Sequence, residues 1–170
     1  MHKLVKLAKN SVELYVKERK IFVPDLDEYK EYLNVRKGAF VTIHKGKDLR
    51  GCIGTYLPTR ENVIEEIVYN AISAATEDPR FDPVSPKELD ELTYSVDLLE
   101  EPQEVKDLSE LDPQIYGVIV VKGFRRGLLL PQIEGVDSVE EQLRIAKIKA
   151  GIHPLDKDVK IYKFKVTRFF

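Results

Sequence analysis

The sequence predicts an α+β fold rich in antiparallel strands, on two observations. The strand-like segments come mainly in pairs joined by short turns, which is the pattern of hairpins rather than of repeated β-α-β units. The chain of 170 residues, 43% of them hydrophobic and 33% charged, has the size and balance of one globular domain. A chain of this length can bury a core without disulfides or a structural metal. We therefore expect a single domain over residues 1–170, with helices flanking an antiparallel sheet.

An amphipathic helix is expected first, over residues 2–20, because Leu4, Leu7 and Leu14 recur on one face at helical spacing. Pro24 ends this region. The other expected elements, in chain order, are a short helix at 25–33, strands at 39–44 and 49–53, a helix from about 59 to 78, a strand at 92–98, strands at 116–121 and 124–130, a helix at 139–150 and a strand at 159–170. No internal repeat is visible in the sequence.

Local signals support these assignments. Asn62 with Glu65 approximates a capping box, and Ser138 with Glu141 is a clear one. Gly151 is a good stop for the helix that Ser138 begins. The small residues near the end of the second long helix would let its backbone approach a sheet closely. The strand segments alternate apolar and polar residues, as half-buried strands do.

The charge balance argues against a general nucleic-acid binder. The formal net charge is −2, whereas such a protein needs an excess of Lys and Arg to neutralise phosphates. Two local basic groups could contact phosphate, although cations on hairpins and sheet edges usually just remain solvated. These groups are Arg125 and Arg126 on the second hairpin, and Lys160, Lys163, Lys165 and Arg168 on the last strand.

The sequence gives no sign of secretion or of a membrane. The first residues lack the apolar core of a signal peptide, and no apolar run approaches the length needed to cross a bilayer. We therefore expect a cytoplasmic protein without a membrane partner. The single cysteine, the single methionine, the lack of tryptophan and the many charged residues are typical of a protein from a hot environment.

The segment Leu49-Arg50-Gly51-Cys52-Ile53-Gly54 is the strongest candidate for a working site. On a strand, Arg50 and Cys52 point to the same face, and a guanidinium beside a thiol favours the nucleophilic thiolate. Gly51 lacks a side chain and Gly54 can take positive φ, so a ligand could approach this backbone closely. The competing interpretation is that Cys52 is a small buried hydrophobe. The sequence leaves both open.

A nucleophilic thiol usually needs an oriented base, and His44 is the nearest candidate in the sequence. If Cys52 pairs opposite Phe40, then Thr42 and His44 share its face, whereas a shift of one residue turns them away. The sequence does not fix this register. One cysteine and three scattered histidines show no zinc-ligand spacing. Magnesium stays open, because the carboxylates are abundant and a magnesium site leaves no compact signature in the sequence. We assign no residue to a metal and expect no cofactor.

Two further segments stand out. In Asp78-Pro79-Arg80-Phe81 the proline restricts Asp78 to extended conformations, and Arg80 offers a planar fork for a carboxylate or phosphate. The simpler alternative is that Asp78 and Arg80 close a turn. In Gly127-Leu128-Leu129-Leu130-Pro131-Gln132 three leucines run into a proline, which must end a strand or lie at an edge.

Together these three segments resemble the AMMECR-type domain family, which is named after a disease-linked chromosomal region (Alport syndrome, midface hypoplasia, elliptocytosis). The resemblance covers nearly the whole chain. It implies an α+β fold with a larger and a smaller lobe and a cleft around which the three motifs gather. Relatives often have a tryptophan soon after the Leu-Pro-Gln segment, where this chain has Gly135-Val136-Asp137.

The resemblance also implies partners, because microbial proteins of this kind often occur beside, or fused to, a Memo-like protein and a radical S-adenosylmethionine enzyme. It supplies no reaction. Two functions therefore stay open. In the first, Cys52 is a nucleophile or thiol carrier, Arg50 stabilises the thiolate or binds an anionic group, and Asp78, Arg80 and Gln132 position the substrate. In the second, the same cleft belongs to a non-catalytic binding or adaptor module for a protein, nucleotide or nucleic acid.

Overall fold

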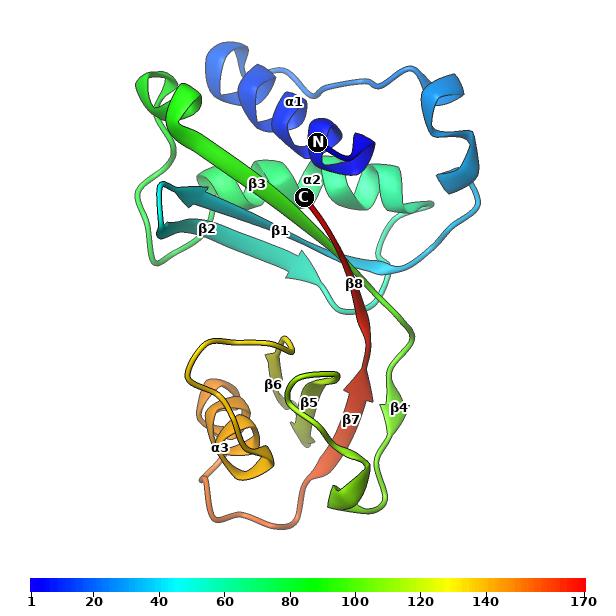
Figure 1. Cartoon of the computed structure of the whole chain (residues 1–170), viewed down its shortest axis with the longest axis vertical. Coiled ribbons are helices and arrows are strands. Elements are labelled where there is room, and N and C mark those ends of the chain that lie inside the picture. The colour runs from blue at the N-terminus through cyan, green and yellow to red at the C-terminus, as the bar shows by residue number, and fades with distance from the viewer. The chain divides into compact units, whose positions relative to one another are not determined.

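The computed structural model describes residues 1–170 and divides them into two compact units (Figure 1). Unit 1 comprises Met1–Leu99 with Thr167–Phe170, and unit 2 comprises Glu100–Val166. Each unit contains helices and its own four-stranded sheet. The pairs β1–β2, β1–β3, β4–β7, β5–β6 and β5–β7 are antiparallel, which confirms the predicted α+β fold class.

Unit 1 builds its core between two helices and one face of its sheet. Its strand order is β2-β1-β3-β8, and a single buried cluster joins α1, α2 and the apolar residues of β1 and β3. On β1 the residues Ala39, Val41 and Ile43 are fully buried in this core. Alternation therefore places Phe40 and Thr42 on the opposite face, which we call the helix-free face. The elements are α1 (Lys3–Glu18), η1 (Leu26–Tyr32), β1 (Gly38–Lys45), β2 (Asp48–Thr55), α2 (Val63–Thr76), η2 (Pro86–Glu91), β3 (Leu92–Leu99) and β8 (Val166–Phe169).

Unit 2 has a second core beneath one helix. Its strand order is β4-β7-β5-β6, and Val118, Val120 and Leu129 of the sheet pack with Leu143 and Ala146 of the helix. The elements are β4 (Gln103–Glu104), η3 (Leu108–Glu110), β5 (Gly117–Lys122), β6 (Arg125–Leu129), α3 (Val139–Ala150) and β7 (Lys160–Phe164).

The two units repeat one topology that the sequence does not reveal. In each, a hairpin leads into a helix and then a third strand, and the first strand of the hairpin lies between the other two. The turns match as well, because Lys45 pairs with Asp48 in β1–β2 and Lys122 pairs with Arg125 in β5–β6. A fourth strand, β8 or β4, borders the third strand in each sheet.

Most predicted elements are present, and their ends follow the predicted caps. The side chains of Asn62 and Ser138 accept hydrogen bonds at the starts of α2 and α3, and Gly151 ends α3 in the left-handed region. The prediction of one final strand over 159–170 was wrong. This segment forms β7 and β8, which belong to different sheets, and the alternation of apolar and polar residues continues across the break, so it gave no sign of the change. None of the helices has the length and apolarity required to span a membrane.

Candidate functional site

Cys52 lies on the helix-free face of unit 1, directly opposite Thr42 in the β1–β2 ladder. A hydrogen bond joins Cys52 Sγ to Thr42 Oγ1 at 3.3 Å. Gly54 is the residue opposite Phe40, so the register differs from the one considered above by two residues, which preserves the face. Thr42 therefore shares the face of Cys52. His44 lies opposite Leu49, and no hydrogen bond joins it to the thiol.

Asp78 fastens the chain after α2 to the edge of β2 beside Cys52. Its Oδ2 accepts a hydrogen bond from the Cys52 N–H at 3.0 Å. Arg80 donates from Nε to Oδ1 at 3.1 Å and from Nη2 to Oδ2 at 2.8 Å. The Asp78 side chain is almost fully buried, whereas 55% of the Arg80 side chain is exposed. The side-chain hydrogen bonds from Arg80, with the backbone N–H groups of Cys52 and Arg80, hold the pKa of Asp78 well below its usual range.

The Cys52 thiol is neutral rather than activated. Burial raises its pKa above the usual cysteine value, and the hydrogen bond with Thr42 and the positive charge of Arg80 only partly oppose that rise. The sequence argument expected Arg50 to be the cation beside the thiol. The structure instead pairs Arg50 with Glu88, and the cations whose charges act on the thiol are Arg80 and Arg168.

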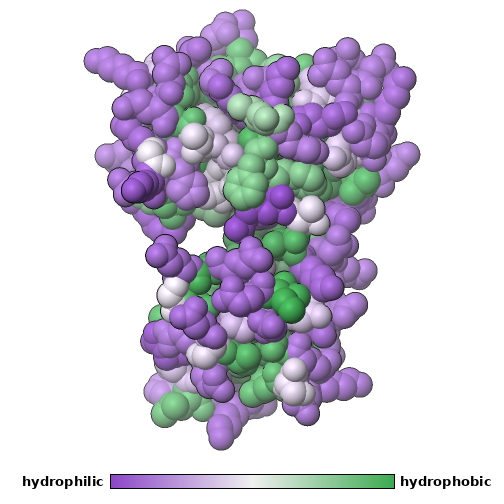
Figure 2. Space-filling view, in the orientation of Figure 1, coloured by the Kyte–Doolittle hydropathy of each residue, from purple (hydrophilic) through white to green (hydrophobic).

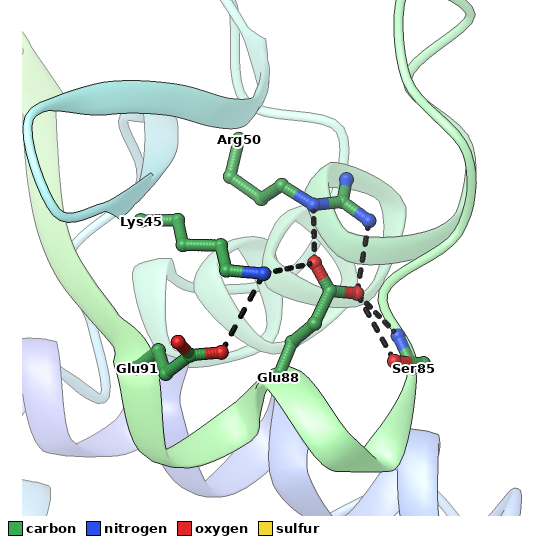
Figure 3. A network of polar contacts seen from close by, with 5 residues as sticks. All are labelled: Lys45, Arg50, Ser85, Glu88 and Glu91. Carbon is green, nitrogen blue, oxygen red and sulfur yellow. Dashed lines mark hydrogen bonds and ion pairs between the residues drawn. The ribbon is translucent and has the colours of Figure 1, made fainter.

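Arg50 instead holds the 3₁₀ helix η2 against the hairpin (Figure 3). Its Nε and Nη2 donate to the two carboxylate oxygens of Glu88 at 2.9 and 3.1 Å. Lys45 and the Ser85 N–H also bind Glu88, and the Arg50 and Glu88 side chains are only 14% and 17% exposed. The arginine first, and then these donors, lower the pKa of Glu88 to about 2. A register shift between Ile43 and His44 makes Arg50 an extra, bulged residue of β2, which ends the alternation assumed above.

The glycines of the motif are required by packing. A Cβ on Gly51 would lie 2.1 Å from the Ala74 carbonyl oxygen of α2. A Cβ on Gly54 would lie 2.3 Å from Cγ of the Phe40 ring. Gly54 does not have positive φ, so that part of the sequence argument was wrong. Both close approaches are to the protein itself.

A second arginine–aspartate pair lies on the same face, and the sequence analysis missed it. Asp97 of β3 pairs with Phe40 in the β1–β3 ladder and is 1% exposed. Arg168 of β8 donates from Nε and Nη2 to its two oxygens at 2.7 and 3.1 Å. The charges of both residues act on Cys52. The sequence did contain a signal for this pair. Asp97 is an acidic residue on the polar side of its strand, where Thr93 and Ser95 are small and uncharged.

Comparison with known proteins now places the chain. The AMMECR1 family profile matches residues 5–169. The chain belongs to the AMMECR1 family. A protein of Thermotoga maritima is 60% identical over 169 residues, which cover 99% of this chain and 97% of that protein. A Clostridium acetobutylicum protein is 46% identical over 166 residues, and these cover 96% of this chain but 35% of that longer protein.

The AMMECR1 fold is also known from a crystal structure. An uncharacterised protein from Pyrococcus horikoshii superposes with a TM-score of 0.90 at 36% sequence identity, covering 98% of this chain and 88% of that one. The names of these relatives report no reaction, substrate or partner. The function must therefore be argued from the geometry of the site.

The remaining predicted site residue of this AMMECR1-family chain, Gln132, belongs to unit 2. It is exposed and has φ of +60°, and its N–H donates to the Pro113 carbonyl at 2.9 Å. Non-glycine residues are uncommon in this conformation, which recurs in turns and at functional sites. The structure thus brings Cys52, Asp78 and Arg80 together, while Arg50 is engaged by Glu88 and Gln132 lies in the other unit.

The predicted basic stripe of the last strand is divided between the two units, and its residues make different contacts. Lys163 and Lys165 place their ammonium groups 4.7 and 5.7 Å from the centre of the Tyr116 ring in unit 2. Arg168 binds Asp97 in unit 1. The structure also shows no group of three or more His, Cys, Asp or Glu side chains arranged to hold a metal ion.

Proposed function

We propose that the helix-free face around Cys52 recognises an anionic group of a substrate or partner, and that the protein is the recognition component of a modification system. One observation carries the proposal: Arg80 and Arg168 are each oriented by a buried aspartate, and the aspartate that holds Arg80 also accepts a hydrogen bond from the Cys52 N–H. A guanidinium held in this way presents its remaining N–H groups in a fixed direction, which suits a carboxylate or a phosphate.

Arg80 is the exposed residue of the Asp78–Arg80 pair. Its Nε and Nη2 are used by Asp78, and 55% of its side chain is exposed. The neutral thiol of Cys52 and the hydroxyl of Thr42 lie next to the Asp78–Arg80 pair and add weakly polar donors. An anion that binds Arg80 would therefore lie beside Cys52.

A second function, thiol-dependent catalysis at Cys52, is supported by a single observation. The Thr42 hydrogen bond and the Arg80 charge both lower the pKa of the thiol against the effect of burial. A catalytic step would still require a base, and His44 makes no hydrogen bond to the thiol. The geometry thus favours recognition over nucleophilic catalysis.

The partners we propose are those that the family resemblance implies, a Memo-like protein and a radical S-adenosylmethionine enzyme. An acidic segment of either protein, or of their common substrate, would supply the anionic group. Co-purification with each partner, with wild-type protein and with Arg80→Gln, tests this part of the proposal.

Anion recognition is tested by NMR titration with inorganic phosphate and with succinate as probes. We expect saturable shifts of the Arg80 and Arg168 Nε–H signals and of the Cys52 amide. Arg80→Gln should abolish the Cys52 shift. Arg144→Gln is the matched control, because Arg144 also pairs with a carboxylate, that of Glu141, but on the surface of α3. Shifts that do not saturate, or that persist in Arg80→Gln, would contradict the proposal.

Alkylation of the only thiol against pH decides between the two functions. We expect a slow rate in the folded protein that rises only above the ordinary cysteine pKa of about 8.5. Arg80→Gln should move this rise to higher pH, because the charge of Arg80 favours the thiolate. A rate that rises well below the ordinary pKa would instead favour catalysis.

A further inference from the structure

Phe124 is the most exposed large apolar side chain in this protein, at 105% relative exposure. It occupies the second position of the two-residue turn between β5 and β6. Gly123, with φ of +59°, supplies the left-handed residue that such a turn needs. The turn therefore projects a phenyl ring from the end of the unit 2 sheet.

The turn is held in place from both sides. Lys122 forms an ion pair with Asp156, and Arg125 Nη1 donates to the Gly151 carbonyl at 2.9 Å. These contacts join the turn to the segment that follows α3. Phe124 is thus presented on a braced turn rather than on a free loop.

The braced segment carries more exposed apolar residues and a surplus of cations. Leu155 is 79% exposed and Ile148 is 51% exposed. In Figure 2 hydrophobic residues also reach the surface of unit 2 among hydrophilic ones. We call residues 122–126 together with 148–160 the basic tip. Its acidic residues are Asp156, which Lys122 engages, and Asp158, whereas its exposed cations are Lys122, Arg125, Arg126, Lys149, Lys157 and Lys160.

We propose that the basic tip docks on the surface of an anionic lipid bilayer, with Phe124 and Leu155 entering the interface between head groups and acyl chains. Apolar side chains that project among cations suit a phase with an anionic surface and an apolar interior. A nucleic acid would use the cations and could stack a base on Phe124. It offers nothing to Leu155 and Ile148, which have no aromatic face.

This docking is independent of the anion site in unit 1 and replaces the sequence-based expectation of no membrane partner. It requires no membrane-spanning segment. Several exposed cations together provide the attraction to the anionic surface. Binding to vesicles must therefore weaken as the salt concentration rises.

The absence of tryptophan from the chain gives a direct test. Phe124→Trp introduces a single indole at the tip, and Phe170→Trp is the matched control, because Phe170 is also exposed, at 75%, but in unit 1. The probes are vesicles of phosphatidylcholine alone and vesicles with roughly one-third phosphatidylglycerol. We expect a blue shift of the emission of Phe124→Trp with the anionic vesicles only, and none for Phe170→Trp.

Co-sedimentation with the same vesicles measures the two contributions. Phe124→Ser should weaken binding about tenfold or more, because a buried phenyl ring is lost. Lys157→Gln and Lys160→Gln should weaken it by about fivefold each. An equal response of Phe124→Trp and Phe170→Trp would overturn the proposal, as would vesicle binding by Phe124→Ser that is as strong as that of the wild type. A shift of Phe124→Trp with polyuridylate but not with vesicles would overturn it in favour of single-stranded nucleic acid.

Discussion

The two units fold the same way and differ where function would be expected. In each hairpin, a glycine of the second strand lies against the carbonyl of an alanine in the following helix: Gly51 against Ala74 and Gly127 against Ala146. Gly51 pairs with Ile43, and Gly127 occupies the same place opposite Val120. The glycine is therefore a requirement of this topology, and its presence in the Cys52 motif says nothing about a ligand.

The other face of the two sheets shows what unit 1 adds. Counting from the paired glycines, Thr42 and Cys52 of unit 1 correspond to Ile119 and Leu128 of unit 2. By the same registers Asp97 corresponds to Phe164. Unit 2 has apolar residues at all three positions, so the fold does not require polar residues there. The polar residues of unit 1 are thus additions to the fold, and they lie beside the arginines of the anion site that we propose.

The largest expected effect concerns the buried charge that unit 2 lacks. Arg168→Leu leaves the Asp97 carboxylate buried without its partner, so we expect the free energy of unfolding to fall by about 4 kcal/mol. Chemical denaturation measures this loss. The double variant Asp97→Leu with Arg168→Leu imitates the apolar face of unit 2 and should recover most of the stability. A double variant as unstable as the single one would refute the correspondence between Asp97 and Phe164.

The shared glycines should be equally sensitive in both units. An alanine Cβ would lie 2.1 Å from the Ala74 oxygen at position 51 and 2.0 Å from the Ala146 oxygen at position 127. We expect Gly51→Ala and Gly127→Ala each to lose about 3 kcal/mol, because helix and strand must separate. Hydrogen exchange resolved by unit measures each loss where it occurs.

The control for these two substitutions is Gly123→Ala. Gly123 has positive φ but nothing within 4 Å of an added Cβ, so only the backbone conformation is strained and the loss should be about 1 kcal/mol. A tolerated Gly51→Ala beside a disruptive Gly127→Ala would mean that the motif glycine serves a ligand after all.

The sequence was sufficient for features that depend on local chemistry. The caps at Asn62 and Ser138, the hairpins and the α+β class follow from short-range signals. The link between Asp78 and Cys52 joins residues 26 positions apart, and only the fold reveals it. The bulge at Arg50 was not predicted, because an alternating strand pattern contains no signal for an extra residue. The repeated topology could not be predicted from the sequence, because one face of the sheet carries polar residues in unit 1 and apolar residues in unit 2.

Acid should weaken the ion pair between Arg50 and Glu88. Glu88 has a pKa of about 2 in the folded protein and an ordinary value of 4.5, so its ionised form is favoured by folding. Its contribution is present above pH 4.5 and is lost as the pH falls toward 2. We expect a loss of about 2 kcal/mol across this window, judged from the size of the shift and reduced for partial exposure. Stability measured against pH reports it.

The matched variants for this window are Glu88→Gln and Glu141→Gln. The first should be less stable than wild type at neutral pH and should lose the part of the pH dependence that Glu88 contributes, while Asp78, whose pKa is also lowered, keeps its own part. The second removes an exposed pair on α3 and should leave that dependence unchanged. If Glu88→Gln kept the full wild-type pH dependence, then Arg50 would not be held by Glu88 in solution, and its availability to a ligand would have to be reconsidered.

The smallest expected effect on stability is at Cys52 itself. Cys52→Ser keeps a group that can hydrogen-bond to Thr42, and the side chain is only half-buried, so the free energy of unfolding should change by about 1 kcal/mol or less. The same variant should weaken the phosphate-dependent shift of the Arg80 Nε–H signal if the thiol borders the bound anion. Leu128→Ser, at the corresponding place in unit 2, should leave that shift unchanged. A large loss of stability in Cys52→Ser with an unchanged titration would make Cys52 a packing residue like Leu128, and the anion site would then rest on Arg80 and Arg168 alone.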